Sequence, residues 1–272
     1  MSQHPMHEAN RRGWDAVSAG WQAEIDARVD WRSIPANIQL VLDDVELKYL
    51  GDVSGRSACV LGSGDNLAAF ALAAAGARVT SVDISEVQLD IAAGRADELG
   101  LAIVFHRADV ADLGGLCGPI SPESPGGPPD DGFDIVYTGG HVAVWVADLW
   151  RYYSEGIRIL KPGGLFMVNE YHPFRRLWKH SAGPLKQEYP YFDCGPFTYD
   201  RSEELPEGTE PLPSYEFHWT VSEMTRALLE GGCELLAMEE YGDGRQPWEG
   251  DAPLENMPTN LVLVGRKKPV AP

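Results

Sequence analysis

Hydrophobic and polar positions follow two different periods along this chain. Near the N-terminus, large apolar side chains recur at spacings of three and four between Trp14 and Val29, with polar and charged residues between them. This spacing is typical of an amphipathic helix. From Ser57 onward, short apolar runs alternate with helical windows, which is the pattern of βαβ units around a parallel sheet. We therefore expect a helical region over residues 1–56 and an α/β domain over residues 57–272.

Local signals mark where the predicted helices begin and end. Ser85 and Gln88 are spaced as a capping box that begins one helix, and Gly100 ends that helix. Thr220 and Glu223 are spaced as a second capping box. The expected helices cover residues 67–75, 86–99, 142–160 and 221–230. The expected strands cover residues 57–61, 77–82, 101–105, 133–137, 165–169, 233–240 and 259–266.

Two segments interrupt the alternation of strands and helices. Residues 114–132 are rich in proline and glycine and hold few large apolar side chains, which predicts a surface loop. Residues 172–214 contain many aromatic residues and prolines. A long insertion of this kind in a compact domain is usually a lid or a substrate-binding segment. We therefore expect the second segment to cover the substrate.

Composition limits the possible partners and the location. The 272 residues include 22 basic and 41 acidic side chains, a net charge of −19, whereas phosphate binding needs a surplus of basic ones. The longest apolar stretch, residues 67–77, is shorter than the roughly 20 residues that span a bilayer, and the N-terminus lacks the apolar core of a signal peptide. The four cysteines show no CxxC or zinc spacing. We expect a cytoplasmic protein with reduced thiols, no metal, and no nucleic-acid or membrane partner.

A glycine-containing turn follows the first predicted strand. Gly62 and Gly64 allow the backbone to approach a ligand closely at the carboxyl edge of the sheet. Asp83 ends the second predicted strand, where an acidic residue can accept hydrogen bonds from both hydroxyls of a ribose. Together these residues indicate a nucleoside-containing cofactor. NAD matches less well, because Leu67 stands where the dinucleotide motif has its third glycine.

Five short motifs occur in a characteristic order along the α/β region. They are Leu61-Gly62-Ser63-Gly64, Val82-Asp83-Ile84-Ser85, Ala108-Asp109-Val110, Phe133-Asp134-Ile135-Val136 and Leu160-Lys161-Pro162-Gly163-Gly164-Leu165. With them the chain resembles the class I S-adenosylmethionine-dependent methyltransferases of the small-molecule type over about residues 57–266. The resemblance implies a Rossmann-like, doubly wound α/β sheet of seven strands, mostly parallel with an antiparallel last strand. It also implies a helical N-terminal lid and S-adenosylmethionine as the cofactor.

The resemblance assigns a part of the cofactor to each motif. The backbone at Gly62 and Gly64 would face the methionine part, Asp83 would hold the ribose, and Asp109 would meet the adenine amino group. Thr138 would lie near the methionine amino group. The full set of expected cofactor contacts is Gly62, Ser63, Gly64, Asp65, Asn66, Asp83, Ile84, Asp109, Val110, Thr138 and Trp21. The chain departs from the family at Val60, where an acidic residue is usual, and at Asn66, where a third glycine is usual; Asp65 could replace the missing carboxylate.

Methyl transfer from a sulfonium requires alignment of the nucleophile and, where needed, removal of its proton. Histidine is the side chain best suited to take a proton near neutral pH. His172 follows the fifth predicted strand and His141 the fourth, so we expect one of them, His172 first, to be the base. Alternatively His141 caps a helix and His172 holds a turn. The expected substrate contacts are Glu170, Tyr171, Arg175, Trp178, Tyr215 and His218.

A basic cluster follows the fifth predicted strand in this acidic protein. Residues 172–187 contain Arg175, Arg176, Lys179 and Lys186 and no acidic side chain. The cluster could bind a carboxylate or phosphate of the substrate, or it could pair with the acidic residues that follow. Nearby aromatic residues could line an apolar pocket.

These features favour methyl transfer to the oxygen or nitrogen of a small-molecule acceptor, anionic or aromatic, by a monomer or homodimer. Two alternatives remain open. One is another transfer from this cofactor, such as aminopropyl transfer. The other is a catalytically silent S-adenosylmethionine-binding protein that regulates a partner.

Overall fold

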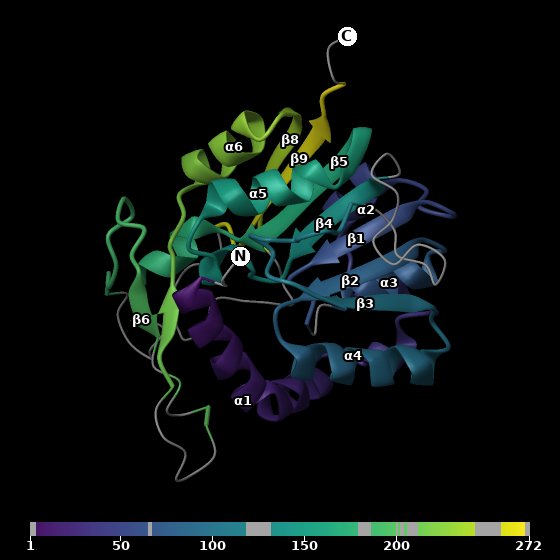
Figure 1. The fold of residues 1–272 in the computed structure, drawn as a ribbon, viewed down its shortest axis with the longest axis horizontal. Coiled ribbons are helices and arrows are strands. Elements are labelled where there is room, and N and C mark those ends of the chain that lie inside the picture. Colours follow the sequence, from purple (N-terminus) through teal and green to yellow (C-terminus); the bar gives the residue numbers. More distant parts are fainter. Residues whose placement is uncertain are drawn as a thin grey trace.

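A seven-stranded mixed sheet forms the centre of the molecule (Figure 1). The computed structural model describes residues 4–64, 67–117, 132–178, 186–199, 201, 204–205, 212–242 and 257–269. The strand order is β3-β2-β1-β4-β5-β9-β8, and β9 runs antiparallel to both of its neighbours. This confirms the predicted α/β sheet with an antiparallel last strand. The strands are β1 Ser57–Leu61, β2 Arg78–Asp83, β3 Ile103–Arg107, β4 Phe133–Gly139, β5 Leu160–Tyr171, β8 Cys233–Tyr241 and β9 Asn260–Lys267.

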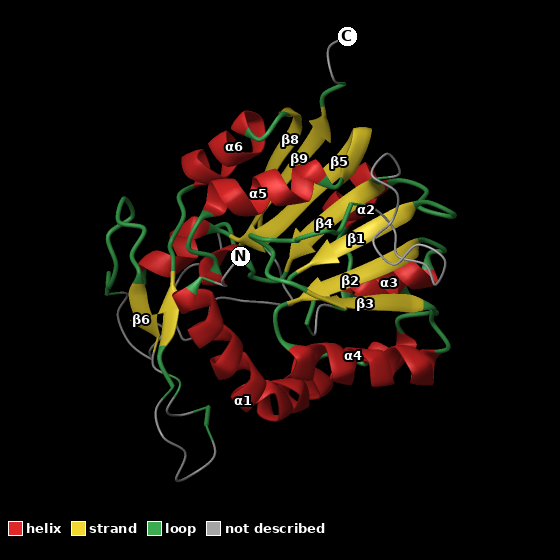
Figure 2. Cartoon of the chain, viewed as in Figure 1, coloured by secondary structure: helices red, strands yellow, loops and turns green. Residues whose placement is uncertain are grey.

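Helices cover both faces of the sheet (Figure 2). Along β1, Cys59 and Leu61 belong to the apolar core that includes α5 and α6. The alternate residues Ala58 and Val60 belong to the core that includes α2, α3 and α4. Because side chains alternate between the faces of a strand, a run that is apolar throughout is buried on both sides. The helices are α1 Pro5–Arg28, α2 Asp44–Leu50, α3 Ala68–Ala74, α4 Glu86–Leu99, α5 Leu149–Arg158 and α6 Val221–Glu230.

The predicted capping signals mark the ends of α4 and α6. The Ser85 side chain accepts a hydrogen bond from the Gln88 N–H at 3.1 Å, and Gly100 ends α4 with φ +66°. Thr220 and Glu223 form the complete reciprocal capping box of α6. These contacts lie within three residues of each other, so the local sequence is enough to specify them.

The predicted helix over residues 142–160 is wrong in its first part. Residues Ala143–Trp145 form only a 3₁₀ turn, and α5 begins after Asp148, whose side chain accepts from the Arg151 N–H at 2.9 Å. The main-chain N–H groups of Val142 and Ala143 donate instead to the carboxylate of Glu170. A contact with another strand therefore replaces the first helical turn.

Two strands start at least two residues away from their predicted first residue. The third begins at Ile103, because the Leu101 N–H still donates to the Ala96 carbonyl at the end of α4. The fifth begins at Leu160, whose main chain already pairs with Phe133 of β4.

Helix α1 lies across the ends toward which β1, β2 and β4 point, and it runs from the β6–β7 pair to α4 (Figure 1). The small antiparallel pair of β6 (Phe197–Tyr199) and β7 (Ser214–Glu216) was not predicted. It lies within the expected insertion of residues 172–214, of which residues 179–185, 200, 202–203 and 206–211 are outside the described part. Of the expected loop over 114–132, residues 118–131 are also outside it.

The four cysteines are free thiols. Cys59 and Cys233 are buried, and burial raises the pKa of the Cys233 thiol to about 11 and that of Cys59 still further. A thiol is a nucleophile only as its thiolate, so neither buried cysteine is suited to covalent chemistry at neutral pH. Within the described residues, no helix is long and apolar enough to cross a membrane.

Candidate functional site

The turn after β1 needs its first glycine. Gly62 has φ +60°, and a Cβ atom at this position would lie 2.5 Å from the Val142 side chain. A side chain larger than hydrogen would therefore be strained and would clash. The N–H of Gly64 donates to Oδ2 of Asp83 at 2.8 Å, which ties the turn to the end of β2. Asp65 and Asn66 lie outside the described residues.

Asp83 is held at the carboxyl end of β2 with both carboxylate oxygens bonded. Besides the Gly64 contact, Oδ1 accepts from the Ser85 N–H at 2.7 Å. The Ser85 hydroxyl donates to Asp15 of α1 at 2.6 Å. The carboxylate is therefore fixed in direction, and α1 is attached to the same edge of the sheet. Ile84, between these residues, is half-buried.

Two buried glutamines lie beside this turn. Gln22 of α1 donates from Nε2 to Oε1 of Gln88 at 3.0 Å. Within the described residues, Gln22 Oε1 and Gln88 Nε2 have no hydrogen-bond partner, although both atoms are buried. A Cβ atom on Gly64 would lie 3.0 Å from Gln88. A buried acceptor and a buried donor without partners suit the hydroxyl groups of a ribose, so these residues fit the nucleoside part of S-adenosylmethionine.

Asp109 is the second acidic residue predicted at the cofactor edge. Its Oδ2 lies 2.6 Å from Nδ1 of His7, and its Oδ1 accepts from the Ala111 N–H at 2.9 Å. Nε2 of His7 accepts from the Ala147 N–H at 2.8 Å, so the histidine carries its hydrogen on Nδ1 and donates it to Asp109. Val110 is buried. Helix α1 thus contacts Asp109 directly and is joined to Asp83 through Ser85.

Two other predicted cofactor contacts are placed differently. The hydroxyl of Thr138 is fully buried and hydrogen-bonded to the Tyr152 hydroxyl of α5, so only the main chain of Thr138 remains for a contact with the methionine part. Trp21 is half-buried on α1, with its ring 5.9 Å from the ring of Trp14. Trp14 in turn lies against Trp145, which connects α1 to the segment after β4.

Residues 59–164 match the family model of a methyltransferase domain. The chain contains a methyltransferase domain and has the fold of the class I S-adenosylmethionine-dependent methyltransferases. The uncharacterized methyltransferase YbaJ of Bacillus subtilis is 24% identical over 246 residues, which cover 86% of this chain and 90% of that protein.

Solved structures share the fold of this methyltransferase. An S-adenosylmethionine-dependent methyltransferase from Mesorhizobium loti aligns with a TM-score of 0.56 and 21% identity, over 81% of this chain and 94% of its own. A chain from a complex that contains the Haloferax volcanii Trm112 methyltransferase activator aligns with a TM-score of 0.59 and 19% identity. That alignment covers 97% of this chain and 99% of the other.

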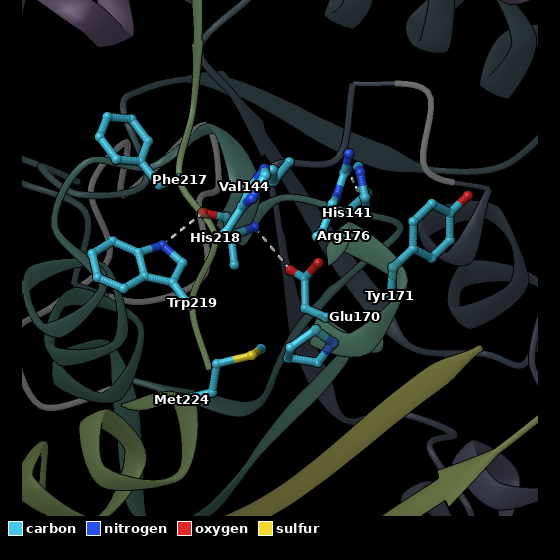
Figure 3. A pocket seen from close by; sticks show the side chains of 11 residues that line it. His141, Val144, Glu170, Tyr171, Arg176, Phe217, His218, Trp219 and Met224 are labelled. Atoms are coloured by element: carbon cyan, nitrogen blue, oxygen red, sulfur yellow. Dashed lines mark hydrogen bonds between the residues drawn. The ribbon is translucent and has the colours of Figure 1, made fainter. Parts of the chain in front are cut away.

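The methyltransferase has a small cavity of about 30 Å³ at the carboxyl ends of β4 and β5 (Figure 3). Such a volume holds about two water molecules, so an acceptor can enter only if the covering segments move. Figure 3 shows polar side chains on one side of the cavity and apolar ones on the other. The lining residues are His141, Ala143, Val144, Glu170, Tyr171, Pro173, Arg176, Phe217, His218, Trp219 and Met224.

Glu170 is the carboxylic acid among the residues that line this cavity, and its pKa is shifted upward. Its side chain accepts from the N–H groups of Val142 at 3.1 Å and Ala143 at 3.0 Å, and the residue is 3% exposed. Burial raises the pKa of Glu170 to about 7, although the N–H donors and Arg176 oppose that rise. The carboxyl group therefore changes charge near neutral pH.

His141 lies in the cavity with a strained backbone. Its φ of +88° is uncommon for a residue with a side chain. Its ring lies 4.1 Å from the ring of Tyr171, and Nδ1 lies 3.5 Å from Nη2 of Arg176. Strain of this kind persists where surrounding contacts impose it, and it is frequent in active sites.

His172 is buried outside the cavity, and both of its ring nitrogens have partners. Nδ1 accepts from the Phe174 N–H at 3.1 Å, and Nε2 lies 2.7 Å from Oε1 of Glu240. Because Nδ1 is an acceptor, Nε2 carries the hydrogen and donates it to the carboxylate. This geometry favours the turn-holding role for His172 and makes His141 the better placed of the two predicted bases.

The other predicted substrate residues divide between the cavity and its surroundings. Tyr171 and His218 line the cavity. Arg175 lies over the Tyr171 ring at 4.3 Å, Trp178 lies against Phe174, and the main chain of Tyr215 is bonded to Asn10 of α1, so these three support the cavity from outside. Of the basic cluster, Lys179 is outside the described residues.

Glu216 and Met224 are not among the site residues predicted from the sequence. Glu216 is buried at the end of β7, where its carboxylate contacts Arg176 and His218 at 3.2 Å each. Met224 lies on the inner face of α6 and is 2% exposed. The alternation of β7 could have identified Glu216, because Glu216 and His218 are two residues apart and can share a face. No local signal distinguishes Met224 from an ordinary core residue.

Proposed function

We propose that the protein transfers the methyl group of S-adenosylmethionine to an oxygen or nitrogen of a small-molecule acceptor bound in the Glu170 cavity. One observation carries this proposal. The Val142 side chain lies against Gly62 of the cofactor turn, while its N–H donates to Glu170 of the cavity. The cofactor edge and the cavity are therefore neighbours on opposite sides of a single residue, as a direct transfer between two bound molecules requires.

The chain's own residues would hold the cofactor in three parts. Gly62 and Gly64 present main-chain atoms to the methionine part, Asp83 accepts from the ribose hydroxyls, and Asp109 faces the adenine. When bound, the cofactor supplies a methyl group activated by the positive charge on sulfur. The protein has to orient the acceptor and exclude water.

The cavity lining indicates the kind of acceptor. Phe217, Trp219 and Tyr171 are aromatic residues that can lie against a flat or apolar molecule. Arg176 offers a guanidinium group to an anionic substituent, but this group is already paired with Glu216. An anionic acceptor would have to compete with that ion pair.

Isothermal titration calorimetry with S-adenosylhomocysteine tests the cofactor part of the proposal. The Asp83→Ala variant should bind about 1.5–3 kcal/mol more weakly than the wild type, the range for hydrogen bonds to a charged group. Asp90→Ala is the matched control, because Asp90 is exposed on α4 and should leave the affinity unchanged. Equal affinity of wild type and Asp83→Ala would refute the assignment of the cofactor edge.

Transfer of a tritiated methyl group from S-adenosylmethionine tests the activity. The acceptor probes are phenol, catechol, aniline and benzoate, which cover hydroxyl, amine and carboxylate groups on a small aromatic ring. Labelled product from any probe supports a small-molecule methyltransferase. Tight cofactor binding without transfer to these probes or to the small-molecule fraction of a cell extract would favour a silent cofactor-binding protein.

A further inference from the structure

Glu216 and His218 form a buried carboxylate–imidazole pair at the cavity. Oε2 of Glu216 lies 3.2 Å from Nε2 of His218, and the two side chains are each 6% exposed. Nδ1 of His218 is buried, and no described residue supplies it with a hydrogen-bond partner. If Nε2 donates its hydrogen to the carboxylate, Nδ1 keeps a lone pair.

The contacts around Glu216 keep it ionised. Burial would raise the pKa of this carboxyl, but the hydrogen bond with His218 and the charge of Arg176 outweigh burial and lower it. Nη1 of Arg176 donates to Oε1 of Glu216 at 3.2 Å, so each carboxylate oxygen has its own partner. Glu216 is therefore an acceptor toward His218, with its direction fixed by Arg176.

The His218 ring is also fixed in direction. It lies 4.8 Å from the ring of Tyr189 and 4.6 Å from the ring of Phe197, measured between centroids. The other titratable groups of the cavity are His141, Glu170, Tyr171 and Arg176. A ring packed against two aromatic side chains and tied at Nε2 cannot turn freely, so its Nδ1 keeps one direction.

We propose that Nδ1 of His218 takes the proton of the acceptor, with Glu216 as the positioning residue that fixes its tautomer. This inference rests on the proposed function. The reaction forms a bond between the acceptor oxygen or nitrogen and the methyl carbon, breaks the carbon–sulfur bond with its electron pair left on sulfur, and releases one proton. His218 receives that proton, and the adjacent carboxylate of Glu216 stabilises the resulting imidazolium.

The arrangement defines a chemical class of acceptor. A base is useful only when the reacting group still carries its proton on binding, as a neutral hydroxyl or N–H group does. A carboxylate acceptor needs no base. We therefore expect a neutral hydroxyl or N–H compound at His218, and carboxylate methylation should need no proton transfer to this histidine.

Long-range ¹H–¹⁵N NMR on protein with ¹⁵N-labelled histidine rings tests the tautomer without any acceptor. With S-adenosylhomocysteine bound at pH 8, His218 should carry hydrogen on Nε2 and a lone pair on Nδ1, with its signals assigned by their loss in His218→Asn. Glu216→Gln should abolish this preference. His172 is the internal control, since its tautomer is set by Phe174 and Glu240 and should stay the same.

Methyl transfer to the same probes gives the second readout. His218→Asn should lower kcat for phenol or catechol by about 10²–10⁴-fold, with the affinity for S-adenosylhomocysteine unchanged. Turnover of benzoate, which has no proton to lose, should fall far less than turnover of phenol or catechol.

Either of two results would overturn the proposal. One is hydrogen on Nδ1 of His218 in the wild type, and the other is a wild-type kcat for phenol in His218→Asn. If the wild type methylates none of the probes, the NMR measurement of the His218 tautomer tests the proposal by itself. Failure of S-adenosylhomocysteine to bind would instead contradict the proposed function, and calorimetry detects that separately.

Discussion

Replacing Glu170 with glutamine should make the stability of the protein less dependent on pH. Burial raises the pKa of this carboxyl from its ordinary 4.5 to about 7 in the folded chain. Between these two values the folded state holds a proton that the unfolded state has lost. The contribution of Glu170 to stability is therefore fully present below pH 4.5 and is lost as the pH rises through 7.

The pKa difference sets the size of the effect. Each unit of difference corresponds to about 1.4 kcal/mol, so the complete loss is on the order of 3 kcal/mol. Between pH 5 and pH 8 the wild type should lose about 2–3 kcal/mol of unfolding free energy relative to Glu170→Gln. The amide cannot ionise, but it keeps an oxygen that can accept from the Val142 and Ala143 N–H groups.

Urea unfolding at several pH values between 5 and 8 measures this difference. Glu234→Gln is the control, because Glu234 is an exposed residue of β8 whose pairing with Arg266 is at 3.7 Å. The stability of this control should follow the wild type at every pH. Parallel plots of unfolding free energy against pH for wild type and Glu170→Gln would show that Glu170 stays ionised in the fold. This result would refute the raised pKa of the buried carboxyl.

Two further substitutions test the cofactor edge. Gly62→Ala should lower the free energy of unfolding by about 1–3 kcal/mol, since it adds a Cβ 2.5 Å from Val142 at a backbone angle that suits glycine; an unchanged midpoint in urea would contradict this. His7→Ala should weaken S-adenosylhomocysteine binding severalfold in calorimetry, because Asp109 loses the contact that joins it to α1. Unaltered affinity would mean that α1 has no part in closing the site.

The strands and the cofactor edge could be predicted because their signals are local. A strand that is buried on both faces reads as a continuous apolar run, and β1 is buried at all five positions. The ends of parallel strands meet at one edge of the sheet. Gly64 and Asp83 therefore lie within hydrogen-bond distance in the fold although 19 residues separate them in the sequence.

The structure of the segment after β4 could not be predicted from its local sequence. Its apolar spacing predicts a helix from residue 142, but the carboxylate of Glu170 takes the N–H groups of Val142 and Ala143. That carboxylate lies 28 residues further along the chain. Helical spacing involves only neighbouring residues and cannot reveal an acceptor on another strand. The helix therefore begins later than the spacing predicts, at Leu149.

The sequence by itself placed His141 and His172 near the carboxyl edge of the sheet, because each follows a predicted strand. Only the tertiary structure decided which ring nitrogens have partners. Glu240, 68 residues beyond His172, lies within hydrogen-bond distance of its Nε2, whereas His218 is tied only at Nε2 within the described residues. Proton chemistry depends on a free lone pair at one atom. Whether that lone pair is free is set by side chains from distant segments, which no local pattern records.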